Sequence, residues 1–209
     1  TEGLPGEIKV NFLSGTSTNP SDAANYKVHP AFTFGEEELT GIWVGKFETS
    51  ILERCTPKND DLNAGCDLTN FTLQIKPNVT SWRGARVSTF FQSIRGMQTD
   101  KYATYGFAND TSYNIHMSKN SEWAAVAYLS QSKYGKYGNP NYEGVNKEIY
   151  QNKSDEYITG MSNGTPSIDI VNTQVTYDTP DTGYGASTTG TIYGVYDMSG
   201  GTWEHVMAN

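Results

Sequence analysis

The chain has 209 residues and a formal net charge of −8. This length fits one domain with a short appendage, and the acidic balance argues against a nucleic-acid binder, which needs a basic surface. Leu, Ile, Val and Phe number only 38, but 14 Tyr, 8 Phe and 4 Trp supply apolar area for a compact core, whereas the Gly- and Asn-rich remainder excludes long helical bundles.

The first 28 residues differ from the rest of the chain. Residues 7–13 (EIKVNFL) alternate polar and apolar side chains as a β-strand does, and residues 14–25 are rich in Gly, Ser, Thr, Asn and Pro. We therefore expect a strand and linker over residues 1–28 and a main domain over residues 29–209. The start of the chain does not show a signal-peptide pattern, which suits a processed chain or a protein exported by another route, such as within a virion.

A β-hairpin is predicted at the start of the main domain. Residues 31–34 (AFTF) and 41–48 (GIWVGKFE) have the composition of strands, and the acidic residues 35–38 would form the turn between them.

Cys55 and Cys66 are the only cysteines, and they enclose ten residues that are rich in turn formers. A disulfide here would clamp a surface loop in an oxidising compartment and stabilise the fold by about 2–3 kcal/mol. The alternative is two free thiols. A zinc site would need further Cys or His ligands nearby, and the sequence offers none.

The first of two predicted helices covers residues 81–95. Its apolar residues recur with a period close to 3.6, and Thr80 or Ser81 would cap its N-terminus.

The second predicted helix covers residues 121–131, with Asn120 or Ser118 as its cap. After Lys133 the pattern predicts about 55 mostly irregular residues, among them a stretch rich in Tyr, Gly and Asn. So long an irregular segment argues against a simple layered fold.

Four segments, in the expected order, resemble the formylglycine-generating-enzyme family (sulfatase-modifying-factor-like domains). Residues 192–205 (IYGVYDMSGGTWEH) resemble its C-terminal signature, residues 78–90 and 116–127 resemble its two helical motifs, and residues 41–49 its opening strand. The resemblance implies an α+β, C-type-lectin-like fold with a small antiparallel sheet, two helices and long irregular loops. In wording the chain is closest to uncharacterised surface or phage-associated proteins of Gram-positive gut bacteria.

The family-like segments also suggest a core. Because each segment contains one tryptophan, we expect Trp43, Trp82, Trp123 and Trp203 to be buried. In the closing unit the rings of Tyr193 and Tyr196 are also expected inside, between tight turns at the glycines Gly194, Gly200 and Gly201. Asp197 and Glu204 are expected to accept hydrogen bonds from backbone N–H groups in those turns.

The sequence predicts no catalytic residue. The family's oxidases use a cysteine pair beyond the W-E-W segment, but this sequence stops at Asn209, so the domain is expected to be C-terminally incomplete. The iron site of the related sulfoxide synthases needs several histidines, and the three present are His29, His116 and His205. We expect no metal site; calcium stays a weak alternative, because the acidic clusters at 59–63 and 178–181 lack EF-hand spacing.

Five N-x-[ST] sequons occur in the chain, where its Asn, Ser and Thr content predicts about three by chance, so their number is not decisive. They are consistent with glycosylation of a surface protein, at Asn70, Asn78, Asn109, Asn152 and Asn163.

The expected function is a non-enzymatic extracellular or virion-surface module that binds a ligand, glycan or receptor through its loops. The Tyr-rich loop has the composition of adaptable binding loops, and Tyr134, Tyr137 and Tyr142 are the predicted contacts. The alternative for these rings is packing on their own loop. The alternative function is a structural subunit of a pilus, filament or virion surface, assembled by strand addition through residues 7–13. An oxidase-like enzyme is a third, weaker reading.

Overall fold

The computed structural model describes residues 29–52, 72–110, 112–143, 147–166 and 174–207. The strand predicted at residues 7–13, the Cys55–Cys66 disulfide and the sequon at Asn70 lie outside these ranges. The chain divides into two compact units, Thr1–Trp43 with Asn209, and Val44–Ala208. This division falls after Trp43, whereas the sequence placed a boundary near residue 28.

In the first unit a short 3₁₀-helix (η1, Pro30–Phe32) leads into β1 (Thr33–Phe34), which pairs with β2 (Glu37–Glu38). The predicted hairpin is therefore wrong in its second strand, because the acidic residues form that strand themselves and residues 41–48 contain none. Gly35 explains the difference. Its φ of 62° allows the chain to reverse within two residues, directly after Phe34.

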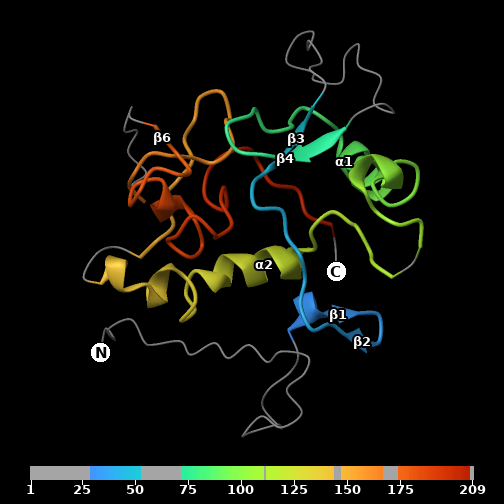
Figure 1. The fold of residues 1–209 in the computed structure, drawn as a ribbon, viewed down its shortest axis with the longest axis horizontal. Helices are drawn as coiled ribbons and strands as arrows, with labels where there is room; N and C mark the ends of the chain where they lie inside the picture. The colour runs from blue at the N-terminus through green and yellow to red at the C-terminus, as the bar shows by residue number, and fades with distance from the viewer. Residues whose placement is uncertain (1–28, 53–71, 111, 144–146, 167–173, 208–209) are drawn as a thin grey trace, which may run out of the picture. The chain divides into compact units, whose positions relative to one another are not determined.

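In the second unit β3 (Thr49–Ile51) pairs antiparallel with β4 (Leu73–Ile75), and helix α1 (Val87–Gly96) lies beside them (Figure 1). The contact is apolar: buried Leu73 and Trp82 pack with a half-buried group that includes Ile51, Phe90 and Ile94. The strand pair and α1 thus share one small core.

Helix α1 begins at Val87, six residues later than predicted, with Arg86 rather than Thr80 or Ser81 at its N-cap position. The backbone N–H groups of Ser81 and Trp82 instead donate to carbonyls of distant segments, at Tyr157 (2.9 Å) and Thr49 (2.8 Å). Gly84 then adopts a φ of 73°, a left-handed conformation that interrupts a helix.

Helix α2 (Asn120–Leu129) agrees with the prediction to within two residues at each end. Its N-cap is Lys119, not Asn120 or Ser118, and the Glu122 carboxylate accepts a hydrogen bond from the Lys119 N–H group (2.8 Å). A glutamate at this third helical position satisfies an otherwise unpaired backbone donor.

The rest of the second unit is mostly loop, with short 3₁₀ turns and one strand pair. The 3₁₀ turns are η2 (Tyr102–Tyr105), η3 (Lys136–Gly138), η4 (Pro140–Tyr142) and η5 (Tyr184–Ala186), and the strand pair is β5 (Met161–Ser162) with β6 (Val175–Thr176). Two helices, small antiparallel strand pairs and long loops confirm the α+β class. Among the residues described, no helix is long and apolar enough to cross a membrane.

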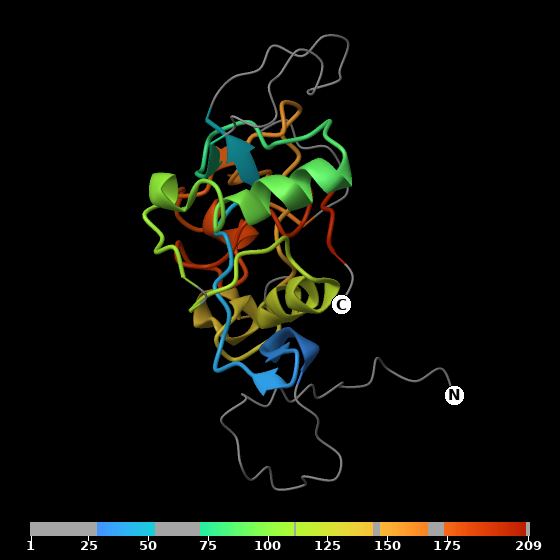
Figure 2. The ribbon, with the colours of Figure 1, turned by 90° about the vertical axis from the view of Figure 1, so that its right-hand side faces the viewer.

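A second core forms where these loops meet (Figure 2, orange to red). Phe47 stacks on Tyr196 with ring centroids 5.3 Å apart, and Tyr177 meets both rings edge-on. The hydroxyl of Tyr196 donates to the carbonyl of Tyr177 (3.0 Å), which satisfies its one polar group inside the core. Tyr196 is therefore inside, as expected.

The tryptophan core is only partly correct. Trp82 is buried and Trp123 half-buried, but Trp43 is fully exposed and Trp203 is 88% exposed. Tyr193, also expected inside, is exposed. The buried aromatic rings are those of Trp82, Phe47, Tyr142 and Tyr196, so the family-like position of a ring does not decide its burial.

One buried cation links three of the loops. Lys136 has no exposed surface; its ammonium donates to the carbonyls of Glu148 and Gly185 (3.0 Å to the latter). It also lies over the rings of Tyr142 and Tyr150, at 4.6 and 3.7 Å from their centroids. Burial lowers the pKa of Lys136 to about 8, although the negative charge of Glu148 acts in the opposite direction and raises it.

We expect Lys136→Ala to lower the free energy of unfolding by about 3 kcal/mol, because it leaves a cavity and two carbonyls without their donor. Lys133→Ala is the matched control: Lys133 also lies over a tyrosine ring, at 4.7 Å from Tyr134, but is exposed, so we expect a change below about 0.5 kcal/mol. Urea unfolding measures both. Equal effects of the two substitutions would contradict the structural role of Lys136.

Candidate functional site

The three predicted contact tyrosines do not form one surface. Tyr142 is only 6% exposed; its ring lies against Lys136 and its hydroxyl donates to the carbonyl of Asp181 (3.2 Å). Burial accordingly raises the pKa of Tyr142 to about 12. Tyr142 is therefore a packing residue, and its prediction as a ligand contact is wrong.

Tyr134 and Tyr137 are exposed. Each carries a lysine over its ring, Lys133 on Tyr134 and Lys147 on Tyr137 at 4.3 Å, and the Lys147 ammonium also donates to the Tyr137 carbonyl (2.9 Å). Both rings remain open to solvent, but neither lines the cavity described below.

The closing motif is anchored by Asp197, which is 2% exposed and has a φ of 62°. Its carboxylate accepts hydrogen bonds from the backbone N–H groups of Gly160 (2.9 Å) and Glu48 (3.3 Å) and from the side-chain amide of Asn152 (2.8 Å). Burial raises the pKa of Asp197 above its ordinary value although these bonds oppose the shift. Asp197 thus holds three distant segments together. Glu204, the other acid of the motif, accepts instead from the indole N–H of Trp123.

A second carboxylate lies directly beneath the C-terminal loop. Glu48 accepts from the Ser81 hydroxyl and from the backbone N–H group of Thr202 (3.0 Å). Gly201 makes this approach possible, since a Cβ there would lie 2.7 Å from the Glu48 carboxylate and φ is 76°. Burial, reinforced by the charges of Asp197 and Glu204, raises the pKa of Glu48 to about 8, although its bonds to Ser81 and Thr202 oppose the shift.

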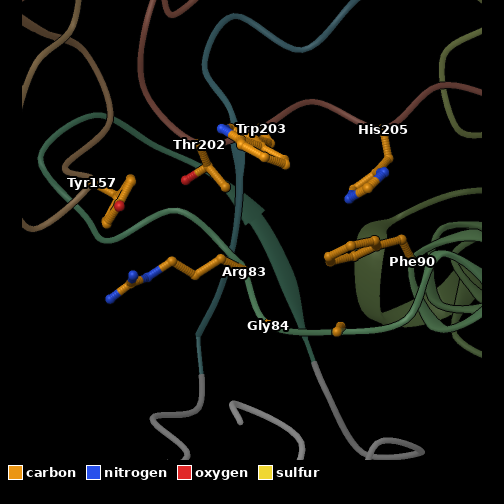
Figure 3. Close-up of a pocket in the computed structure, with 8 residues that line it drawn as sticks. Arg83, Gly84, Phe90, Tyr157, Thr202, Trp203 and His205 are labelled. Carbon is orange, nitrogen blue, oxygen red and sulfur yellow. The ribbon is translucent and has the colours of Figure 1, made fainter. Parts of the chain in front are cut away.

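Above this carboxylate, the chain before α1 and the C-terminal loop enclose a cavity of about 260 Å³ (Figure 3). Thr202 and Trp203 lie between a cation–ring pair and a pair of rings. On one side the Arg83 guanidinium lies over the Tyr157 ring, 4.2 Å from its centroid. On the other side, the rings of Phe90 and His205 stack at 5.7 Å. The full lining is Arg83, Gly84, Ala85, Phe90, Tyr157, Thr202, Trp203 and His205.

The cavity combines exposed ring faces with polar groups that the described residues leave unused. Trp203 presents almost its whole indole to solvent. The Thr202 hydroxyl is buried and has no hydrogen-bond partner among the residues that the structure describes. Flat apolar faces together with a few convergent polar groups are typical of small-ligand sites.

Tyr157 holds an unusual backbone conformation at the rim of the cavity, with a φ of 56°. Bulky residues rarely adopt this left-handed region, and such strain gathers at functional positions. Two hydrogen bonds hold it: its N–H group donates to the Ser154 carbonyl (3.0 Å), and its own carbonyl accepts from the Ser81 N–H group (2.9 Å).

The sequence did not single out Arg83, Tyr157 or His205 as binding residues. One signal was present, because His205 stands where the family-like signature has a second tryptophan. A polar residue at a position expected to hold a ring is a reason to look for a site. Arg83 and Tyr157 come together only in the folded chain.

Burial changes the status of the predicted glycosylation sites. Asn152 is buried, and its side-chain amide donates to the Ile158 carbonyl (2.7 Å) and to the Asp197 carboxylate. Asn163 is also buried. A glycan on either side chain would have to displace this packing, so neither is accessible for glycosylation in the folded protein. Asn78 and Asn109 are exposed.

Each of the three histidines contacts a different part of the chain. His29 accepts from the N–H group of Ala31, His116 contacts the Glu122 carboxylate (3.0 Å), and His205 stacks on Phe90. Within the described ranges, no three His, Cys, Asp or Glu side chains gather where they could hold a metal ion.

Comparisons of the chain with protein-family models, with curated proteins and with solved structures found no match. The functional reading therefore depends on the geometry of the site itself.

Proposed function

We propose that this protein is a non-enzymatic binding module of a cell or virion surface, built on a C-type-lectin-like scaffold of the formylglycine-generating-enzyme type. Its ligand site is the cavity between the Arg83 segment and the C-terminal loop. The observation that carries the proposal is the exposed indole of Trp203, which lines one cavity together with the rings of Tyr157, Phe90 and His205. Single exposed rings are common, but rings grouped around a hollow mark an interaction site.

The chemistry of the cavity favours binding over catalysis. Its ionisable side chains are Arg83 and Tyr157, which lie against each other, and His205, whose ring stacks on Phe90. None of the eight lining residues is a cysteine, serine or carboxylate, and the Thr202 hydroxyl makes no hydrogen bond to the histidine or to any other described residue that could activate it as a nucleophile. What the cavity offers is shape, ring faces and hydrogen-bonding groups.

Glycans are the ligand class that suits these groups. The C–H face of a sugar ring packs on a flat indole, and its hydroxyl groups need a nearby hydrogen-bonding group such as the exposed Arg83 guanidinium. Small-ligand cavities range from roughly 300 to 1,000 Å³. A cavity of about 260 Å³ is therefore suited to one ring, such as a terminal sugar, rather than to an extended chain.

Trp203→Ala is expected to weaken glycan binding at least tenfold on an array and in a follow-up titration, since it removes the stacking face. The substituted side chain is exposed, so we expect the free energy of unfolding to change by less than about 0.5 kcal/mol. The matched control is the double substitution Tyr134→Ala and Tyr137→Ala, which also removes exposed rings but lies outside the cavity. Loss of binding in this control, with Trp203→Ala unaffected, would overturn the assignment of the site.

A further inference from the structure

The cavity has a local charge opposite to that of the whole chain. The protein carries a net charge of −8, yet the cavity lining contains no Asp or Glu and includes the cation Arg83. The nearest carboxylate of the closing motif, that of Glu204, is bonded to the Trp123 indole. Glu48 lies beneath the loop, where it is bonded to Ser81 and Thr202. A positive cavity in an acidic protein favours an anionic ligand.

The Arg83 side chain is held in a form suited to an oxyanion. Its guanidinium carbon lies 4.2 Å from the centroid of the Tyr157 ring and, among the described residues, the group makes no ion pair. A cation–π contact uses none of the N–H groups as hydrogen-bond donors, so a carboxylate can bind them with two parallel hydrogen bonds. Because the ring already orients the guanidinium, less side-chain entropy is lost on binding.

The platform under Arg83 is itself fixed. Tyr157 is held in its left-handed conformation by backbone bonds to Ser154 and to Ser81, and Ser81 is only two residues from Arg83. The segment that supplies the cation is thus bonded to the segment that supplies the ring. Such mutual support is typical of a preorganised site.

We infer that the ligand of this cavity is an acidic sugar: a pyranose ring whose carboxylate pairs with the Arg83 guanidinium while its C–H face packs on Trp203. Uronic acids and sialic acids share this chemistry. The inference rests on the proposed function, and it adds the anionic group that decides between otherwise similar sugars.

The test compares probes that differ only in the carboxylate. We expect the full chain to bind methyl glucuronide at least tenfold more tightly than methyl glucoside, or sialyllactose at least tenfold more tightly than its methyl ester, in titrations followed by NMR at low salt. The pair that shows the difference identifies the source of the carboxylate. Raising the salt concentration should reduce the preference, because it screens the ion pair.

Arg83→Met should reduce the preference for the acidic sugar to less than twofold, because it removes the cation that pairs with the carboxylate. Arg86→Met is the matched control, since Arg86 is an exposed arginine three residues away that does not line the cavity; it should keep the full preference. Equal affinity for acidic and neutral sugars would overturn this inference. If Trp203→Ala still weakens the binding of both sugars, the proposed function stands. Absence of binding to either kind of sugar, or to any glycan of the array, overturns both.

Discussion

Asp197→Ala is expected to lower the free energy of unfolding by about 3–5 kcal/mol, the largest effect of any single substitution considered. The carboxylate is buried and accepts hydrogen bonds from Gly160, Glu48 and Asn152. Alanine would leave these donors unpaired, and each buried unpaired donor costs about 1–3 kcal/mol. Because this carboxylate joins the Glu48 segment to residues 152–160, we also expect the variant to unfold at a lower urea concentration.

Two further substitutions make this experiment specific. Asp197→Asn should have an intermediate effect, because asparagine tolerates the left-handed backbone of this position and keeps one acceptor oxygen. Asp178→Ala is the control: Asp178 is exposed and accepts only a local bond from the Thr176 hydroxyl (2.7 Å). Urea denaturation of the three variants checks the ranking, and an Asp197→Ala effect no larger than that of Asp178→Ala would show that Asp197 does not anchor the fold.

Stability should also depend on pH through Glu48. Burial raises its pKa in the folded protein from an ordinary value of 4.5 to about 8, so the unfolded chain releases the proton at a lower pH than the folded protein does. The contribution of Glu48 is therefore greatest below pH 4.5 and declines as the pH rises to about 8, by up to about 1.4 kcal/mol for each pH unit. Above that pH the carboxylate is ionised in both states and the loss is complete.

Glu48→Gln isolates this effect from the titration of other groups. Glutamine keeps an acceptor for the Thr202 N–H group and a polar group for the Ser81 hydroxyl, so the variant should match the wild type near pH 5. At pH 9 it should be more stable than the wild type by several kcal/mol, because it has no charge to bury beside Asp197 and Glu204. Parallel stability curves for the two proteins across this range would refute the assignment of a protonated Glu48.

The parts of the fold that local sequence controls were predicted well. Helix α2 has an uninterrupted pattern and a glutamate at its third position, and both act within one turn of chain. The start of α1 was missed because Ser81 and Trp82 bond to segments far away in the sequence. The hairpin failed for a local reason, since the conformation of Gly35 shortens the turn.

Burial of individual rings could not be predicted in the same way. Tyr142 and Tyr137 belong to the same tyrosine-rich loop, yet only Tyr142 is covered, by Lys136 and the Asp181 segment. Trp203 lies in a motif that suggested a core position, but the bond between Glu48 and Thr202 holds its loop at the surface. These outcomes depend on contacts between distant segments, and a single sequence with no alignment does not display them.

The same reason explains why the candidate site was not foreseen. Its lining comes from three stretches of chain, around Arg83, around Tyr157 and around Trp203, which meet only after folding. The sequence did indicate that aromatic residues in loops would carry the function. In the structure, the exposed ring that lines a cavity is Trp203 of the C-terminal motif, whereas Tyr134 does not line it.

The most direct test of the ligand site is an amide and indole NMR titration of the full chain with its strongest glycan from the array. The indole N–H signal of Trp203, assigned with a Trp203→Phe variant, should shift with the ligand concentration, together with the amide signals of Thr202 and His205. Shifts confined to the amides of Tyr134 and Tyr137, with the Trp203 signal unchanged, would place the binding site elsewhere and contradict this account.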